Sequence, residues 1–186
     1  MKPEEVHDAA ASVLGFWFEE LSEDQHWVKS ITLDEAIAER FGALRDRVAA
    51  SAAAGWRSTP ETVLAAVILV DQFSRNMFRG EAEAFVHDGL ARELTLFAIA
   101  RGFDEQLPKA RRCFIYLPLE HAEDPDLQAL SIKCFTALGN EQYLGFAQDH
   151  AAVIEQFGRF PGRNRALGRI STKIEREYLS QPGAGW

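Results

Sequence analysis

Three short polar segments contain the side chains whose chemistry could serve a function. The first follows an uninterrupted apolar run at 63–70 and holds Asp71, Gln72, Arg75, Asn76 and Arg79. Residues four apart share one face of a helix, so we expect Asp71 beside Arg75. A carboxylate that follows such an apolar run is expected to be buried and to need a cation. The segment therefore predicts either the polar floor of a pocket or an ion pair that locks the helix end.

The second polar segment, 116–124, combines three carboxylates with an imidazole. Glu120, Glu123 and Asp124 lie at helical spacings, and His121 is a group that gains or loses a proton near neutral pH. Glu120 and His121 are thus candidate catalytic groups. We expect no metal site, because the segment contains neither His-Glu-x-x-His nor a pair of Glu-x-x-His motifs. In the alternative interpretation, the acids stabilise a helix start and pair with arginines.

The third polar segment, 157–165, is predicted to be a shaped loop because it contains two glycines and a proline. Its Arg159, Arg163 and Asn164 are candidate ligand-binding residues, since a guanidinium binds a carboxylate or a phosphate in a bidentate manner. His150 precedes the segment on an expected helix and could face the same region. The alternative is that these arginines pair with the protein's own carboxylates, and that His150 is a core residue.

Helix-start signals place these segments in an all-α fold. Proline at a first helical position, or a capping residue before an acid, marks starts at Pro3, Thr32, Thr59, Asp88, Asp124, Asn140 and Thr172. Glycine stops follow at 102 and 139, and we expect Pro118 to end the helix before it. No pair of strands with a tight turn is predicted. The pattern indicates roughly eight helices in a single domain over residues 1–186.

Composition narrows the class of partner. The chain of 186 residues has a net charge of −8, which argues against nucleic acid or an anionic membrane as the main partner. The longest apolar run is far shorter than the roughly 20 residues that cross a bilayer. Two isolated cysteines do not suggest a disulfide framework, and acids precede the apolar stretch at 9–18 where a secretory signal needs positive charge. We therefore expect a cytoplasmic protein without a cofactor.

The charge is unevenly distributed along the chain. Residues 1–158 carry a net charge of −12, whereas residues 159–186 carry +4. The C-terminal segment is expected either to pack against the acidic body or to line an anion site. Composition leaves the oligomeric state open, because Trp27, Trp56 and Trp186 could each belong to a core, a site or an interface.

Four segments together resemble a known family. Residues 13–18, with the sequence Val-Leu-Gly-Phe-Trp-Phe, precede 71–79, 116–124 and 157–164 in the order and spacing of an uncharacterised bacterial family, domain of unknown function 924. The resemblance covers nearly the whole chain and implies antiparallel helix pairs in a tetratricopeptide-like, right-handed array. It implies no activity. The chain departs from the family pattern at Ser74, where proline is usual, and at Gly162, where histidine is usual, which weighs against a catalytic histidine in that loop.

Three functional hypotheses follow. The first is a binding module whose concave face uses these polar residues to hold a small anionic or zwitterionic molecule or a peptide. The second is a hydrolase in which Glu120 or His121 is the general base and arginines stabilise developing negative charge. The third is an interaction scaffold without a pocket, in which the polar segments form internal ion pairs. Whether the protein is an enzyme stays open.

Overall fold

The computed structural model describes residues 1–185, and no β-strand occurs in that range. Ten α-helical segments are present, eight of them with seven or more residues, as the sequence indicates. In chain order they are α1 (Pro3–Gly15), α2 (Ile31–Ala50), α3 (Pro60–Val67), α4 (Phe73–Met77), α5 (Asp88–Ala100), α6 (Phe103–Gln106), α7 (Lys109–Glu120), α8 (Pro125–Leu138), α9 (Glu141–Phe157) and α10 (Lys173–Leu179).

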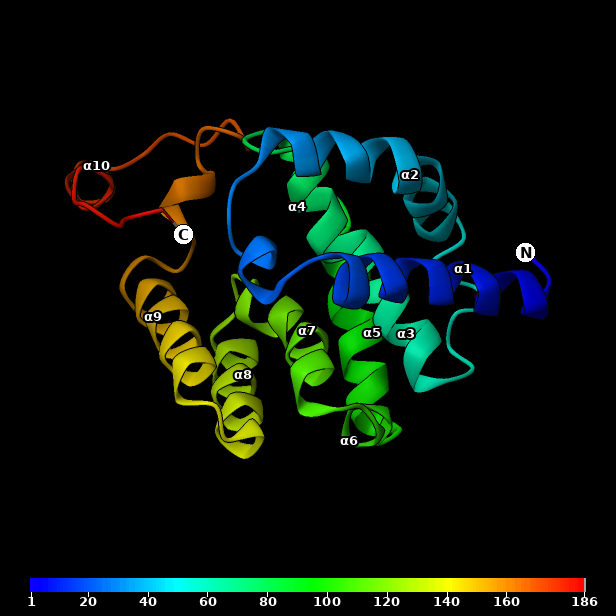
Figure 1. Cartoon of the computed structure of the whole chain (residues 1–186). Coiled ribbons are helices and arrows are strands. Elements are labelled where there is room, and N and C mark those ends of the chain that lie inside the picture. Colours follow the sequence, from blue (N-terminus) through cyan, green and yellow to red (C-terminus); the bar gives the residue numbers. More distant parts are fainter. Residues whose placement is uncertain (186) are drawn as a thin grey trace.

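Helices pack against their neighbours in the sequence and also against helices farther along the chain. α7, α8 and α9 lie side by side, α1 crosses α3, and α2 packs on α4, while α10 stands at one end of the molecule (Figure 1). The predicted all-α fold with packed helix pairs is therefore confirmed. A right-handed, tetratricopeptide-like array stays a prediction.

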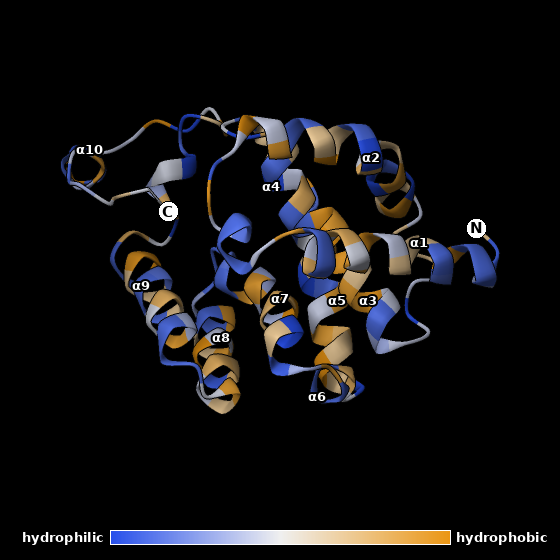
Figure 2. Cartoon of the chain, in the orientation of Figure 1, coloured by the Kyte–Doolittle hydropathy of each residue, from blue (hydrophilic) through white to orange (hydrophobic). Residues whose placement is uncertain are grey.

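The centre of the core is the helix that the apolar run predicts. Every residue from 63 to 70 is fully buried, and Figure 2 shows apolar residues concentrated around α3 and α5 with polar residues on the outer helix faces. Trp56 is also buried in this core, whereas Trp27 is half-exposed. Trp186 lies outside the described residues. A chain segment that is apolar on all sides is stable only when other helices surround it, which is why α3 occupies the middle.

Several helix starts form as expected. Thr59 caps α3 by accepting a hydrogen bond from the Thr62 backbone N–H, and Thr172 caps α10 in a capping box. Asp124 and Asn140 accept backbone N–H bonds at the starts of α8 and α9. Each cap satisfies N–H groups that have no partner within the helix.

Three predicted helix boundaries are wrong. Ser30, not Thr32, caps α2, which leaves Asp34 in the first turn free to make distant contacts. Asp88 is the first residue of α5 and does not cap it, because its carboxylate pairs with arginines. Pro118 lies inside α7, which continues to Glu120. A proline in the last turn removes a single helical hydrogen bond, and the buried Leu117 and Leu119 hold that turn in place.

Two π-helical turns interrupt the regular helices. The first, η1 (Phe16–Glu20), follows α1, and the second, η3 (Ile68–Gln72), joins α3 to α4. Such turns are rare, and they occur often at functional sites because the extra residue changes the direction of the side chains. The second turn holds Asp71 and Gln72, which are both buried.

Candidate functional site

A cleft of about 750 Å³ lies beside the second π-turn. Seven of the sequence-predicted site residues line it: Gln72, Arg75, Asn76, Arg79, Glu120, His121 and His150. They come from the end of the α3–α4 unit, the last turn of α7 and the middle of α9. Residues separated by up to 78 positions in the chain are thus brought to one surface. A pocket is therefore present where the sequence predicts either a pocket or internal ion pairs.

Asp71 lies beneath the cleft and is fully buried. Its carboxylate contacts Arg75 Nη1 at 2.8 Å and His121 Nδ1 at 2.9 Å, and it accepts a hydrogen bond from Gln72 Nε2 at 2.6 Å. Burial alone favours the neutral acid, but the Arg75 guanidinium and the His121 hydrogen bond hold the pKa of Asp71 well below its usual range. Asp71 is therefore an ionised acceptor, and the expected pairing with Arg75 is confirmed.

The contact with Asp71 sets the tautomer of His121. An ionised carboxylate can only accept, so the imidazole donates from Nδ1 and its Nε2 carries a lone pair. Nε2 has no hydrogen-bond partner among residues 1–185, and His121 lines the cleft. Burial and the Arg75 guanidinium lower the pKa of His121 against the attraction of Asp71, so the ring is neutral. The arrangement is that of a general base oriented by a carboxylate.

Glu120 and His150 form the second titratable pair of the cleft. His150 Nδ1 lies 2.8 Å from the Phe146 carbonyl oxygen and 3.2 Å from Glu120 Oε1. Burial raises the pKa of Glu120 to about 8, and the carboxylates of Asp71 and Asp149 act in the same direction. Burial also lowers the pKa of His150 to about 3. At neutral pH this contact therefore joins a protonated carboxyl to a neutral imidazole, so it is not an ion pair.

The guanidinium groups that line the cleft already have carboxylate partners. Arg75 binds Asp88 through two hydrogen bonds of 3.0 and 3.1 Å in addition to its contact with Asp71. Arg79 binds Asp34 through Nε and Nη2 at 2.5 and 2.9 Å. These pairs agree with the alternative interpretation of the sequence, in which the arginines form internal ion pairs. The cleft nevertheless lies directly beside them.

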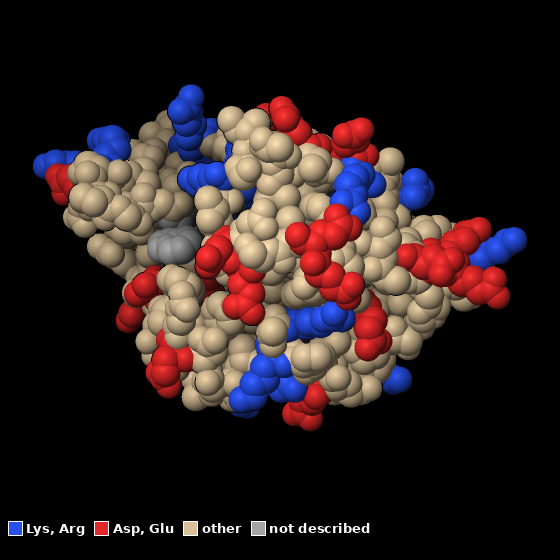
Figure 3. Space-filling view, in the orientation of Figure 1, with Lys and Arg blue, Asp and Glu red and all other residues tan. Residues whose placement is uncertain are grey.

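Arginines of the C-terminal segment pack against the acidic body of the protein. Arg163 contacts Asp88 at 3.4 Å and donates to the His121 carbonyl oxygen at 2.9 Å, and Arg169 binds Glu123 at 2.7 and 2.9 Å. Figure 3 shows Lys and Arg side chains gathered over the C-terminal segment, near α10, with acidic side chains distributed over the rest of this face. From the sequence, the C-terminal segment is expected either to pack against the acidic body or to line an anion site. These contacts support packing against the acidic body.

Five predicted site residues do not line the cleft: Asp71, which lies beneath it, and Asp124, Arg159, Arg163 and Asn164. Asp124 caps α8, and Arg159 binds Glu175 within the C-terminal segment. The partly buried Arg163 donates to the His121 carbonyl oxygen, and Asn164 donates to Ser171 Oγ. Arg163 can therefore act on the cleft only through His121 and Asp88, whereas Asp124, Arg159 and Asn164 belong to the scaffold.

Seven further residues line the cleft that the sequence did not single out as site residues, although it allowed Trp27 to belong to a site: Asp24, His26, Trp27, Val28, Leu117, Gln142 and Phe146. The first four belong to or follow a short 3-10 helix, η2 (Glu23–His26), which folds back so that Trp27 stacks on Phe114 of α7 with ring centroids 5.7 Å apart. His26 Nε2 lies 2.7 Å from the Trp17 carbonyl oxygen of the first π-turn. The only local signal was the cluster of His26 and Trp27, because the contacts that bring them to the cleft, such as those with Phe114 and Tyr143, are with distant residues.

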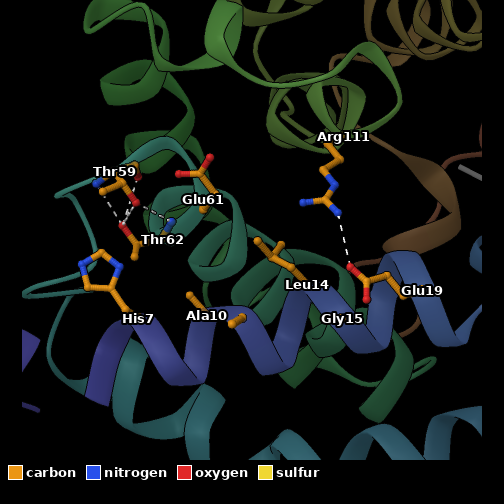
Figure 4. Close-up of a pocket in the computed structure, with 10 residues that line it drawn as sticks. His7, Ala10, Leu14, Gly15, Glu19, Thr59, Glu61, Thr62 and Arg111 are labelled. Atoms are coloured by element: carbon orange, nitrogen blue, oxygen red, sulfur yellow. Dashed lines mark hydrogen bonds and ion pairs between the residues drawn. The ribbon is translucent and has the colours of Figure 1, made fainter. Parts of the chain in front are cut away.

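A second groove, of about 380 Å³, runs along α1 and meets the start of α3 and α7 (Figure 4). His7 points toward the Thr59–Thr62 cap at one end, and an Arg111–Glu19 contact of 3.7 Å lies at the other. None of the sequence-predicted site residues lines this groove. The polar cleft beside Asp71 is therefore the stronger candidate site.

Residues 1–185 contain neither a cluster of metal ligands nor a membrane-spanning helix. No group of three or more His, Cys, Asp or Glu side chains is arranged to hold a metal ion within that range. In the same part of the chain, no helix has the length and apolar character needed to cross a membrane.

The raised pKa of Glu120 predicts a pH-dependent contribution to stability. The unfolded chain releases this proton near pH 4.5, whereas the folded chain keeps it until about pH 8, so Glu120 costs stability progressively between these values. We expect Glu120→Gln to gain stability relative to the wild type as the pH rises through this range, by on the order of 5 kcal/mol. Urea unfolding followed by circular dichroism at a series of pH values measures the difference.

Glu155→Gln, on the exposed side of α9, is the matched control and should keep a constant difference from the wild type. A constant difference for Glu120→Gln as well would contradict the raised pKa.

Comparisons with known proteins assign the family. The chain matches the family described as bacterial protein of unknown function (DUF924) over residues 13–183. It is also similar to the solved structure of a protein of unknown function from Agrobacterium tumefaciens, with 37% identity and a TM-score of 0.90, covering 94% of this chain and 98% of the other. No curated protein matches the chain. The resemblance seen in the sequence is confirmed: the chain belongs to the bacterial family of unknown function DUF924.

Proposed function

We propose that the protein binds a small molecule in the polar cleft beside Asp71. The observation that carries this proposal is the convergence of seven polar residues from three parts of the chain on one hollow of about 750 Å³. A purely structural ion-pair network gains nothing from an adjoining open volume, because exposure to water weakens its interactions. Small-molecule sites typically combine a concave shape, apolar walls and a few convergent polar groups.

The floor and the rim of the cleft differ in polarity. The buried Glu120 and the partly buried His121 form its floor, whereas Trp27, Val28 and Phe146 supply exposed apolar surface at its rim. This division suits a ligand with a polar head and an apolar body. The sequence allows an anionic or a zwitterionic small molecule, or a peptide. Because the arginines are already paired, a zwitterionic ligand fits the cleft better than a simple anion does.

The second candidate function is acid–base catalysis in the same cleft. The Asp71–His121 contact favours it, since the carboxylate fixes the tautomer that leaves Nε2 as a base. Glu120 supplies a protonated carboxyl at neutral pH, so a base and an acid are present together. A hydrolase would use His121 to activate water and Glu120 to protonate the leaving group. Glu120 would then be the general acid, and not the general base that the sequence also allows.

Filling the cleft tests the binding proposal. Gln142 is exposed at the start of α9 and lines the cleft, so Gln142→Trp should occupy the cleft without disturbing the core. We expect thermal-shift screening of small amines, carboxylates and amino acids to yield a ligand that stabilises the wild type and not Gln142→Trp. Glu141→Trp places the same side chain one residue away, outside the cleft lining, and should behave like the wild type. Stabilisation that persists in Gln142→Trp would place the ligand elsewhere and refute the proposal.

Catalysis has a separate test. A general base contributes about 10²–10⁴-fold to a rate, so hydrolysis of an ester or amide by the wild type should fall by at least about 100-fold in His121→Gln. The exposed His7, which lies in the second groove, provides the control His7→Gln, whose rate should not change. Equal rates in His121→Gln and the wild type would exclude His121 as the base, while leaving the binding proposal intact.

A further inference from the structure

Two amide side chains that line the cleft donate their nitrogen atoms to carboxylates. Gln72 Nε2 donates to Asp71 Oδ2 at 2.6 Å, and Asn76 Nδ2 donates to Asp34 Oδ1 at 2.8 Å. An ionised carboxylate only accepts hydrogen bonds, so each amide must offer it the nitrogen. Gln72 Oε1 and Asn76 Oδ1 are consequently left as acceptors. Both residues are more than nine-tenths buried, and both line the cleft.

The imidazole of His121 must also donate to an ionised carboxylate. Its Nδ1 donates to Asp71, so the lone pair of Nε2 is a third acceptor at the cleft. None of these three acceptor atoms has a hydrogen-bond partner among residues 1–185, and none belongs to the fully enclosed unpaired polar atoms of that range. Asp71 and Asp34 thus engage the donor atoms and leave three acceptor atoms on residues that line the cleft.

The charges around the cleft favour a cation. The guanidinium groups are held by carboxylates on their inner sides, and one further carboxylate, that of Asp24, lines the cleft. Four aspartates therefore face three arginines in this region: Asp24, Asp34, Asp71 and Asp88 against Arg75, Arg79 and Arg163. The overall charge of −8 acts in the same direction at long range.

The rim of the cleft adds aromatic surface. Trp27 is 47% exposed and Phe146 is 38% exposed, and both line the cleft. Large exposed aromatic side chains beside a polar site mark a binding surface, and an aromatic ring face attracts a cation as well as an apolar group. Val28, which is also exposed, extends the apolar rim.

We propose that the cleft recognises a primary ammonium group on an apolar body, with Gln72 Oε1, Asn76 Oδ1 and His121 Nε2 as its hydrogen-bond acceptors. An ammonium group has three N–H donors and no acceptor, which matches three acceptors that have no protein donors. The apolar body lies along the aromatic rim. This inference rests on the proposed binding function, and it specifies the ligand class that the sequence left open.

Glu120 couples ammonium binding to a proton. The charged and titratable groups that face it are Asp71 from η3, Asp149 and His150 from α9, and its neighbour His121. The two aspartates disfavour the ionised form of Glu120, whereas an ammonium group in the cleft favours it. Binding should therefore release the Glu120 proton and strengthen as the pH rises toward 9.

Ligands with the same body and different heads test the inference directly. We use phenethylamine, which carries only an ammonium group, and 3-phenylpropionate, which carries only a carboxylate. Isothermal titration of the wild-type protein should detect phenethylamine with a Kd of about 1 mM or below and should detect no 3-phenylpropionate at about 10 mM. Binding of phenethylamine should be lost in Gln142→Trp and retained in Glu141→Trp.

The pH dependence supplies an independent result. With a Glu120 pKa of about 8, phenethylamine affinity should rise about tenfold from pH 7 to pH 9 in the wild type and in Glu155→Gln, while the ligand itself stays protonated. It should stay flat in Glu120→Gln.

Three other outcomes would each contradict either the ammonium inference or the proposed cleft function. Binding of 3-phenylpropionate without phenethylamine overturns the ammonium inference but leaves the proposed cleft function standing. Failure of phenethylamine to bind at about 10 mM overturns the inference, whereas binding that persists in Gln142→Trp overturns the cleft function as well.

Discussion

The buried carboxylate of Asp71 is the constraint on which the rest of the site depends. An ionised group without exposure to solvent needs compensation from every side, and Arg75, His121 and Gln72 provide it. Each of these three partners comes from the cleft wall, so the need to stabilise one carboxylate fixes the orientation of the surface above it. The π-turn positions Asp71 at this point, directly after the most apolar segment of the chain.

Arginines connect the buried Asp71 to carboxylates farther from the core. Arg75 joins Asp71 to Asp88, and Asp88 is in contact with Arg163 from the C-terminal segment. Arg163 then donates to the backbone oxygen of His121, which returns the chain of contacts to the cleft. Arg163 of the basic C-terminal segment thus supports the cleft wall through its own contacts, and a substitution of Arg163 should act on the site indirectly.

Local signals in the sequence predict the helices well, but they do not predict the contacts between distant helices. Thr59, Asp124 and Asn140 act as caps within a few residues, so their roles can be inferred without a tertiary structure. The pairing of Asp71 with Arg75 follows from helical spacing. In contrast, Asp34 meets Arg79 across 45 residues and Asp88 meets Arg163 across 75, and no local rule selects these partners. The cleft rim at Trp27 was missed for the same reason.

The tautomer of His121 tests the role of Asp71 most directly: the carboxylate should hold hydrogen on Nδ1 and leave a lone pair on Nε2. Heteronuclear NMR of the imidazole nitrogens at neutral pH measures this tautomer. We expect His121 Nδ1 to have the chemical shift of a protonated nitrogen and Nε2 that of an unprotonated one. A doubly protonated ring, or one with hydrogen on Nε2 alone, would contradict this role of Asp71.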